Sequence, residues 1–287
     1  MHLDLPITLA FALATVALAS VYFRRLTVNR PPIGVVNRRD VWILLAGIVA
    51  IPYLYLALPL AVVATLLALA TLGILLFALE PLAARGPRLM LALGAVALDV
   101  ALALTVGTAS NIFMAVNNVV LAIAVIGIVN LWAQSGMRAV HVAAMGLGLA
   151  VYDLVATAGL PLMTDLLERL DEIPLVPFMG WHAAGDQLVV GVGDLLMLAL
   201  FPLVIRKAFG RRPAAIALGA ESVVLVALLV VVEFGLIGRI LPAMVVLGPL
   251  MAGLCAIWLR RHGGERSTRE YLAAEAPPRL APAPTLT

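Results

Sequence analysis

The chain has 287 residues, of which 63% are hydrophobic and only 12% are charged. Its mean hydropathy of +1.10 excludes a water-soluble globular domain and indicates an integral membrane protein. The net charge is only +3, and the basic residues occur in short clusters between apolar segments, so we expect no nucleic-acid partner. One cysteine and four scattered histidines provide no recognisable metal-binding pattern, and we predict neither a metal nor an organic cofactor.

Nine apolar segments are long enough to cross the roughly 30 Å hydrocarbon layer as helices. Residues 41–79 contain no charged side chain, and we divide them between Pro52 and Pro59 because they are nearly twice as long as one crossing. The sequence therefore predicts an all-α, polytopic membrane protein with nine transmembrane helices. The predicted spans are 5–23, 41–58, 59–79, 89–107, 113–132, 139–161, 187–205, 214–235 and 241–259.

The distribution of basic residues predicts the orientation of these helices. Of the 19 basic residues, all but Arg169 and Arg239 follow odd-numbered spans. Because cytoplasmic loops are enriched in Lys and Arg, the N-terminus is predicted outside and the C-terminus inside. Nearly all the basic residues are arginine, which is typical of a GC-rich coding sequence, so we expect a bacterial plasma (inner) membrane.

Three parts of the chain follow from this division. Residues 1–138 form a predicted N-terminal part of five transmembrane helices, and residues 139–262 form a predicted second part of four. Residues 263–287 contain four prolines and no apolar span, and we predict a disordered cytoplasmic tail.

Five acidic residues fall within or near the predicted spans: Asp99, Asp153, Asp194, Glu221 and Glu233. An ionisable group inside a membrane is a functional hypothesis by default. Asp153 and Asp194 lie on consecutive antiparallel spans, each roughly 10 to 12 Å below the outer surface at 1.5 Å per helical residue. We therefore expect these two carboxyl groups to face each other.

Glycines accompany both acids. Asp194 ends the sequence Gly191-Val192-Gly193-Asp194, whose glycines weaken a helix and allow another backbone to approach closely. Gly146 and Gly148 precede Asp153 and are predicted to let the sixth and seventh spans pack tightly.

Three short motifs stand out in the second part of the chain: Tyr152-Asp153, Gly191-Val192-Gly193-Asp194 and Pro242-Ala243-Met244. They resemble the signatures of the presenilin and signal peptide peptidase family of intramembrane aspartyl proteases. The similarity extends from about residue 139 to 259, and it implies that the four-helix part 139–262 is the catalytic part. The third motif has Met244 where the family has leucine, and Gly248-Pro249-Leu250 is an alternative match. The chain resembles a bacterial member of this Gly-x-Gly-Asp family.

This resemblance implies that Asp153 and Asp194 are the catalytic pair. It also implies that Tyr152, Gly191, Gly193, Pro242, Ala243 and Met244 shape the site or contact substrate. Two carboxyl groups in contact share one proton, so the ionised one can take a proton from water while the other polarises a peptide carbonyl.

The expected substrates are transmembrane helices or signal-peptide remnants, with the N-terminus inside. A helix in lipid must unwind to be cut, and its freed backbone groups then need partners, such as an exposed strand edge. The outer loop segment 173–181 is a candidate for that edge. The motifs identify no partner subunits.

Other functions remain open on sequence alone. Asp99, Asp153 and Asp194 could form the relay of a proton-coupled transporter or channel, or the chain could be a non-catalytic scaffold. A prepilin-type peptidase also uses a Gly-x-Gly-Asp aspartate, but it works from the cytoplasmic side. We interpret Asp99 as a helix contact more readily than as a relay, and we can name no partner for Glu221 or Glu233.

Overall fold

A computed structural model describes residues 4–28, 38–159, 162–183, 186–234, 242–266 and 270. The described residues form ten α-helices, one short π-helix and one β-hairpin. In chain order these are α1 (Asp4–Arg25), α2 (Arg38–Ala57), α3 (Leu60–Ala78), α4 (Arg85–Thr105), α5 (Asn111–Gln134), α6 (Ala139–Leu154), the π-helix (Val155–Gly159), α7 (Leu162–Leu170), β1 (Phe178–Ala183), β2 (Asp186–Gly191), α8 (Val192–Phe209), α9 (Arg211–Glu233) and α10 (Ala243–His262).

Eight helices in the described part of the chain are long and apolar enough to cross a membrane: α1 to α6, α9 and α10. The predicted helical, polytopic membrane fold is thereby confirmed. The seventh predicted span corresponds to α8, which carries Asp194 near its start and Arg206 and Lys207 near its end. Because of these charges, α8 is not among the eight helices that are apolar enough to cross a membrane. The total of nine spans and their orientation stay predictions.

The division of residues 41–79 into two spans is correct. Helix α2 ends at Ala57 and α3 begins at Leu60. Between them Pro59 has φ −56° and ψ 141°, which is extended backbone. Proline has no N–H for a helical hydrogen bond and also disfavours helical geometry in the residue before it, so the chain breaks here. Pro52 lies inside α2 without ending it.

The predicted start of the seventh span at residue 187 is wrong. Residues Asp186–Gly191 form β2, which pairs with β1 in an antiparallel hairpin, with Phe178 opposite Gly191. The helix begins only at Val192, so Asp194 lies in the first turn of α8 rather than deep inside a helix. The sixth span also departs from a regular helix, because α6 continues as the π-helix after Leu154.

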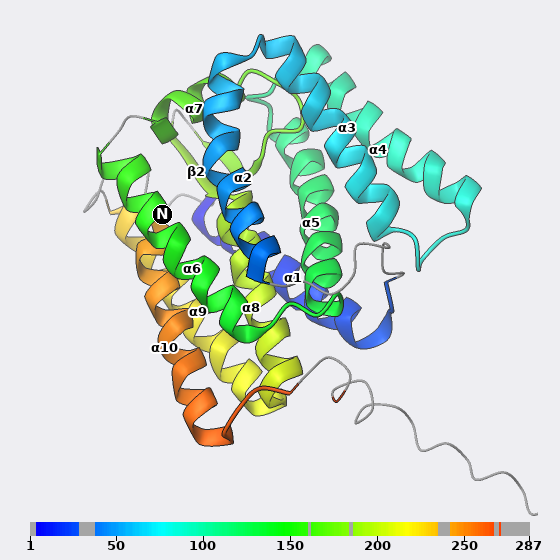
Figure 1. Cartoon of the computed structure of the whole chain (residues 1–287). Coiled ribbons are helices and arrows are strands. Elements are labelled where there is room, and N and C mark those ends of the chain that lie inside the picture. The colour runs from blue at the N-terminus through cyan, green and yellow to red at the C-terminus, as the bar shows by residue number, and fades with distance from the viewer. Residues whose placement is uncertain are drawn as a thin grey trace, which may run out of the picture.

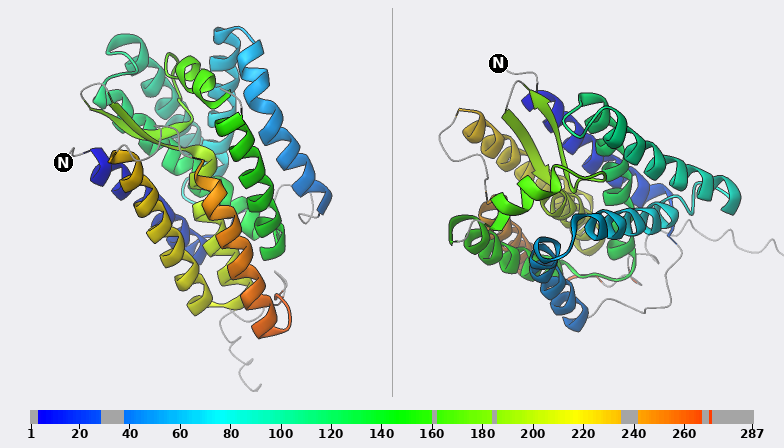
Figure 2. Two further views of the ribbon diagram at one scale, coloured as in Figure 1. Left: turned by 90° about the vertical axis from the view of Figure 1, so that its left-hand side faces the viewer. Right: turned by 90° about the horizontal axis from the view of Figure 1, so that it is seen from above.

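The helices form two packed groups that share α5. One buried cluster joins α1, α5, α6, α8, α9 and α10, and the other joins α3, α4 and α5 with the segment leading to β1. In Figure 1, α3 and α4 lie on one side of the molecule, and α6, α9 and α10 lie on the other. The hairpin and α7 lie together at one end of the bundle in the left view of Figure 2.

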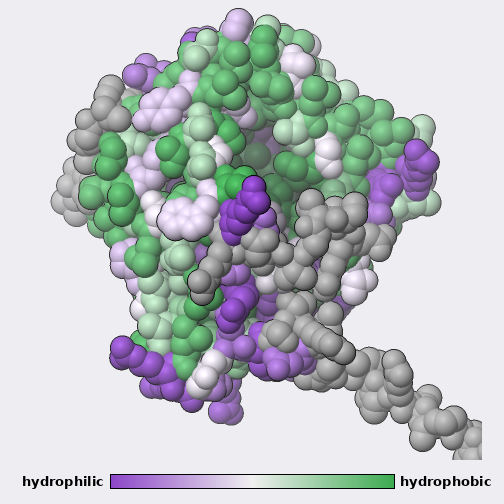
Figure 3. All heavy atoms as spheres, viewed as in Figure 1, coloured by the Kyte–Doolittle hydropathy of each residue, from purple (hydrophilic) through white to green (hydrophobic). Residues whose placement is uncertain are grey.

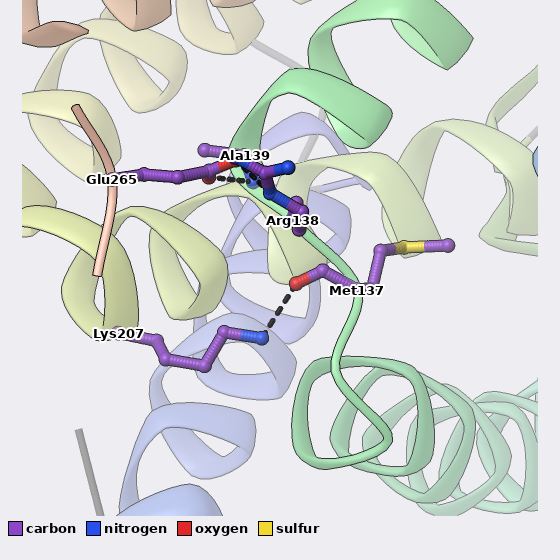
Figure 4. Close-up of polar contacts among 5 residues, drawn as sticks. All are labelled: Met137, Arg138, Ala139, Lys207 and Glu265. Atoms are coloured by element: carbon purple, nitrogen blue, oxygen red, sulfur yellow. Dashed lines mark hydrogen bonds and ion pairs between the residues drawn. The ribbon is translucent and has the colours of Figure 1, made fainter. Parts of the chain in front are cut away.

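A buried lysine ties the opposite end of the bundle together. The ammonium group of Lys207, near the end of α8, donates to the carbonyl of Ala133 at 2.9 Å and to that of Met137 at 2.5 Å (Figure 4). The side chain is only 2% exposed. The last turn of α5 has carbonyls that no helical N–H can reach, and Lys207 satisfies that of Ala133 from α8.

The chain beyond α10 adds a second contact at this end. The carboxylate of Glu265 accepts the backbone N–H of Ala139 at 2.7 Å and pairs with Arg138 at 2.5 Å (Figure 4). Arg266 donates to carbonyls at the end of α8. A disordered tail was predicted for residues 263–287, but its first four residues follow α10 back onto the bundle. Of the rest of this predicted tail, only residue 270 lies within the described part of the chain.

The surface agrees with a membrane environment. Apolar residues cover most of the face seen in Figure 3, and hydrophilic residues gather over the end of α10. Large apolar side chains are exposed along the outer helices, including Trp42, Met90 and Leu104. Exposed apolar side chains at this density indicate contact with lipid rather than water.

Candidate active site

Both predicted catalytic aspartates line one cavity beneath the hairpin. The cavity has a volume of about 200 Å³. Asp153 reaches it from α6 and Asp194 from α8. The rest of the wall is almost entirely apolar, and it includes Leu166, Leu170, Phe178, Val189, Leu225, Leu229 and Ala243.

Asp153 lies at the junction between α6 and the π-helix. Its Oδ2 atom accepts a hydrogen bond from the backbone N–H of Met244 at 3.0 Å. Helix α10 begins at Ala243, directly after the non-helical Pro242. The first N–H groups of a helix have no helical partner, so the one on Met244 is free to bind the carboxylate. This bond joins the first and third motifs.

Asp194 lies where β2 turns into α8. Gly191 is the last residue of β2 and also the N-cap of α8, and Asp194 follows three residues later. A Cβ atom added to Gly191 would stand 3.4 Å from Oδ2 of Asp194, so the carboxylate lies beside the cap. A negative group is favoured here because the N-terminus of a helix carries partial positive charge.

The remaining motif residues differ in their positions. Ala243 is buried and lines the cavity. Tyr152 does not line it, and its hydroxyl has no hydrogen-bond partner within the described ranges. Gly193 is exposed, and an added Cβ would meet no atom within 4 Å. The sequence predicts that another backbone segment approaches Gly193 closely. Among the described residues none does, so this prediction is wrong for Gly193.

The prediction that glycines pack the sixth span against the seventh is confirmed only in part. A Cβ atom added to Gly146 would stand 3.6 Å from Met197 of α8, but 3.4 Å from both Gly248 and Met251 of α10. Gly146 and Gly248 therefore bring α6 mainly against α10. Gly148 faces Leu45 of α2. The alternative third motif, Gly248-Pro249-Leu250, is therefore a helix-packing segment that does not line the cavity. The small residues let α10, the helix that binds Asp153 through Met244, lie close to α6.

Two buried asparagines of α5 hold the hairpin. Asn118 donates to the carbonyl of Gly180 at 2.8 Å and accepts its N–H at 3.1 Å. Asn117 donates to the carbonyls of Val176 and Phe178 at 3.1 and 3.3 Å. The segment 173–181 was predicted as an edge for substrate, but these bonds occupy its outward-facing groups.

Sequence reasoning missed these contacts, although a signal was present. Two adjacent asparagines inside an apolar span must find partners, because an unsatisfied buried amide is unfavourable. Their partners lie about 60 residues further along the chain, and no local pattern identifies them.

Asp99 and Glu221 do not line the cavity. Asp99 is fully buried on α4 and accepts the backbone N–H of Leu175 at 2.8 Å. This contact agrees with the interpretation of Asp99 as a structural group. Glu221 is 1% exposed on α9 and has no hydrogen-bond partner among the described residues. The side chain of Glu233 lies outside the described part. No group of three or more His, Cys, Asp or Glu among the described residues is arranged to hold a metal ion.

The sequence matches no protein-family model and no curated protein. The fold is similar to two crystal structures of a presenilin family intramembrane aspartate protease, in the C222 and P2 space groups. The TM-scores are 0.56 and 0.53, with sequence identities of 18% and 19%. Each match covers 88% of this chain, and 97% and 96% of the respective crystal chains. The predicted resemblance to presenilin is thereby confirmed for the fold.

Proposed function

We propose that this presenilin-like chain is an intramembrane aspartyl endopeptidase with Asp153 and Asp194 as its catalytic pair. One observation carries the proposal: two carboxylates from different membrane helices line a single, mostly apolar cavity. The similarity to presenilin family structures supports the same reaction class.

The proposed reaction needs only the two carboxyl groups and water. The pair holds one proton, because two neighbouring negative charges in an apolar wall repel strongly. The ionised carboxylate removes a proton from water as the oxygen attacks the peptide carbon, and the protonated carboxyl donates to the carbonyl oxygen. Collapse of the tetrahedral intermediate breaks the C–N bond, and the leaving nitrogen takes up the proton that the base had removed from water. The new carboxyl group returns a proton to the aspartate that had donated one to the carbonyl oxygen, so the pair again holds one proton. Either aspartate could be the base.

Backbone dipoles would keep the pair in position during these steps. The N–H of Met244 donates to Asp153, and Asp194 lies at the start of α8. The Met244 bond and the dipole of α8 both come from fixed backbone, so neither needs much rearrangement as charge moves between the carboxyl groups.

The substrate strand would pair with β2. Gly180 turns its N–H and carbonyl toward Asn118, so its backbone groups face away from β2. In an antiparallel pair, a residue and the one opposite it turn their groups outward together. Val189 lies opposite Gly180, so its N–H and carbonyl face away from β1, and Val189 lines the cavity. This edge can accept the backbone of an unwound helix beside the aspartates.

The proposed substrates are transmembrane helices, including signal-peptide remnants, that have their N-terminus inside a bacterial plasma membrane. The expected direction of the substrate helix follows from the predicted orientation of the spans, so an experiment that determines the orientation of the spans also tests this direction. The lipid bilayer is the expected surrounding, and no nucleic acid is expected to bind.

Replacing either aspartate tests this function. Purified full-length protein in proteoliposomes is incubated with a transmembrane-helix peptide, and the products are identified by mass spectrometry. Asp153→Asn and Asp194→Asn should each reduce cleavage to background, while Asp165→Asn, an exposed site on α7, should cut normally. If both variants retain cleavage at the wild-type rate, the proposed catalytic pair is wrong.

A further inference from the structure

We infer that Asn117 and Asn118 of α5 are positioning residues that set which peptide bond of a substrate meets the two aspartates. This inference rests on the proposed function and concerns the predicted N-terminal part of the chain, outside the three motifs. Both side chains are fully buried and contact the hairpin, while the aspartates come from α6 and α8.

The contacts have the geometry of a neighbouring strand. Asn118 gives Gly180 one donor and one acceptor, which is what a paired residue on a strand would supply. Asn117 donates to the next outward-facing carbonyl, that of Phe178, and also to that of Val176. The two amides therefore close the outer edge of β1.

The alternation along the strand agrees with this description. The carbonyls at positions 176, 178 and 180 point toward α5. The carbonyl of Pro177 points the other way and accepts the N–H of Val192 at 3.0 Å. With the edge of β1 closed by α5, a further strand can join the sheet only at β2.

The asparagines also fix the hairpin along its own direction. A strand that slips by one residue turns each side chain to the opposite face, and a slip by two moves the pairing by about 7 Å. Because Gly180 is bound at both its N–H and its carbonyl, β1 cannot slip without losing both bonds. β1 holds Val189 of β2 in register, and β2 leads directly into Asp194.

Asp99 anchors the segment before β1. Its carboxylate accepts the N–H of Leu175, the one described non-glycine residue with a positive φ, at 58°. This left-handed turn directs the chain toward Pro177 and Phe178, which both line the cavity. Three polar residues of α4 and α5 therefore set the position of the strand pair above the aspartates.

The experiment compares Asn118→Leu and Asn117→Leu with Asn130→Leu in the full-length protein. Asn130 is a matched control because it is on the same helix, is also fully buried, and bonds the carbonyls of Ala19 and Ile126 instead of the hairpin. Hydrogen–deuterium exchange of the peptide covering β1 measures how firmly the hairpin is held. Mass spectrometry of the products measures the cleavage position.

In Asn118→Leu and Asn117→Leu, we expect at least tenfold faster exchange in β1 and new products cut one or more residues from the wild-type position. Asn130→Leu should cut at the wild-type position, whatever its effect on yield. A structural role alone would lower the rate without moving the cut, so faster exchange with unchanged products would overturn the register assignment. Unchanged exchange would overturn the holding role itself. If wild-type protein cuts no substrate, the proposed function fails, and exchange still decides whether the asparagines hold β1.

Discussion

Gly248 offers the sharpest test of how the helices position the aspartates. A Cβ atom added there would lie 2.3 Å from the carbonyl oxygen of Gly146, 2.8 Å from its carbon and 3.1 Å from Cβ of Ala150. The nearest atoms belong to the backbone of α6 and cannot rotate away. Gly248→Ala must therefore push α10 and α6 apart.

The size of the displacement follows from these distances. Restoring ordinary contact with the carbonyl oxygen requires a movement of roughly 1 Å. Overpacking of this kind typically costs about 1–3 kcal/mol, against a gain of about 1 kcal/mol from the better helix propensity of alanine. The same movement acts on the 3.0 Å bond from Met244 to Asp153, because these residues lie on the same two helices. A misplacement of about 1 Å in a catalytic group can lower the rate about 10²-fold.

The assay measures thermal unfolding in detergent and cleavage rate for three alanine variants. Gly253→Ala is the control on α10, because an added Cβ meets nothing within 4 Å, and it should be as active as wild type and slightly more stable. Gly146→Ala should be intermediate, because its nearest contacts begin at 3.4 Å. If Gly248→Ala unfolds and cuts like Gly253→Ala, the close packing of α6 on α10 does not position Asp153.

Substitutions at three further positions separate the roles of buried polar groups. Asp99→Asn keeps an acceptor for the N–H of Leu175 and should retain cleavage, whereas loss of cleavage would indicate that Asp99 is a proton relay. Asp99→Leu removes the acceptor and should lower activity and speed hydrogen exchange in the hairpin. Lys207→Met leaves two buried carbonyls without their charged donor and should destabilise the protein by about 2–3 kcal/mol in denaturant titration, with unchanged products. Tyr22→Phe removes a buried 2.8 Å bond to the carbonyl of Ala78, so thermal unfolding should show a loss of about 1 kcal/mol, with cleavage unaffected.

The helical part of the fold was largely predictable from hydropathy. Burial in lipid requires long apolar segments, and a proline between two of them is a physical break, as at Pro59. The hairpin was not predictable in the same way. A short apolar run such as Val189-Val190 fits a strand as well as a helix. Hydropathy alone therefore did not separate β2 from α8 within the apolar segment that begins at residue 187.

The candidate site likewise contains residues that the local sequence identifies and contacts that it does not. The motifs identified Asp153 and Asp194 because acids in apolar segments are rare and their spacing resembled a known family. The partners of the glycines and asparagines could not be read in this way. Gly146 and Gly248 meet across α6 and α10, and which helices become neighbours depends on the packing of the whole bundle.

The contact between Glu265 and the start of α6 has a consequence for biosynthesis. The N–H of Ala139 is 126 positions ahead of the carboxylate that caps it. During translation the start of α6 enters the membrane before Glu265 is made, and the N–H of Ala139 lacks this partner until α8, α9 and α10 have emerged from the ribosome. A nascent chain that stops before Glu265 leaves that helix end uncapped, so premature termination there should yield a bundle that membrane quality-control proteases can recognise.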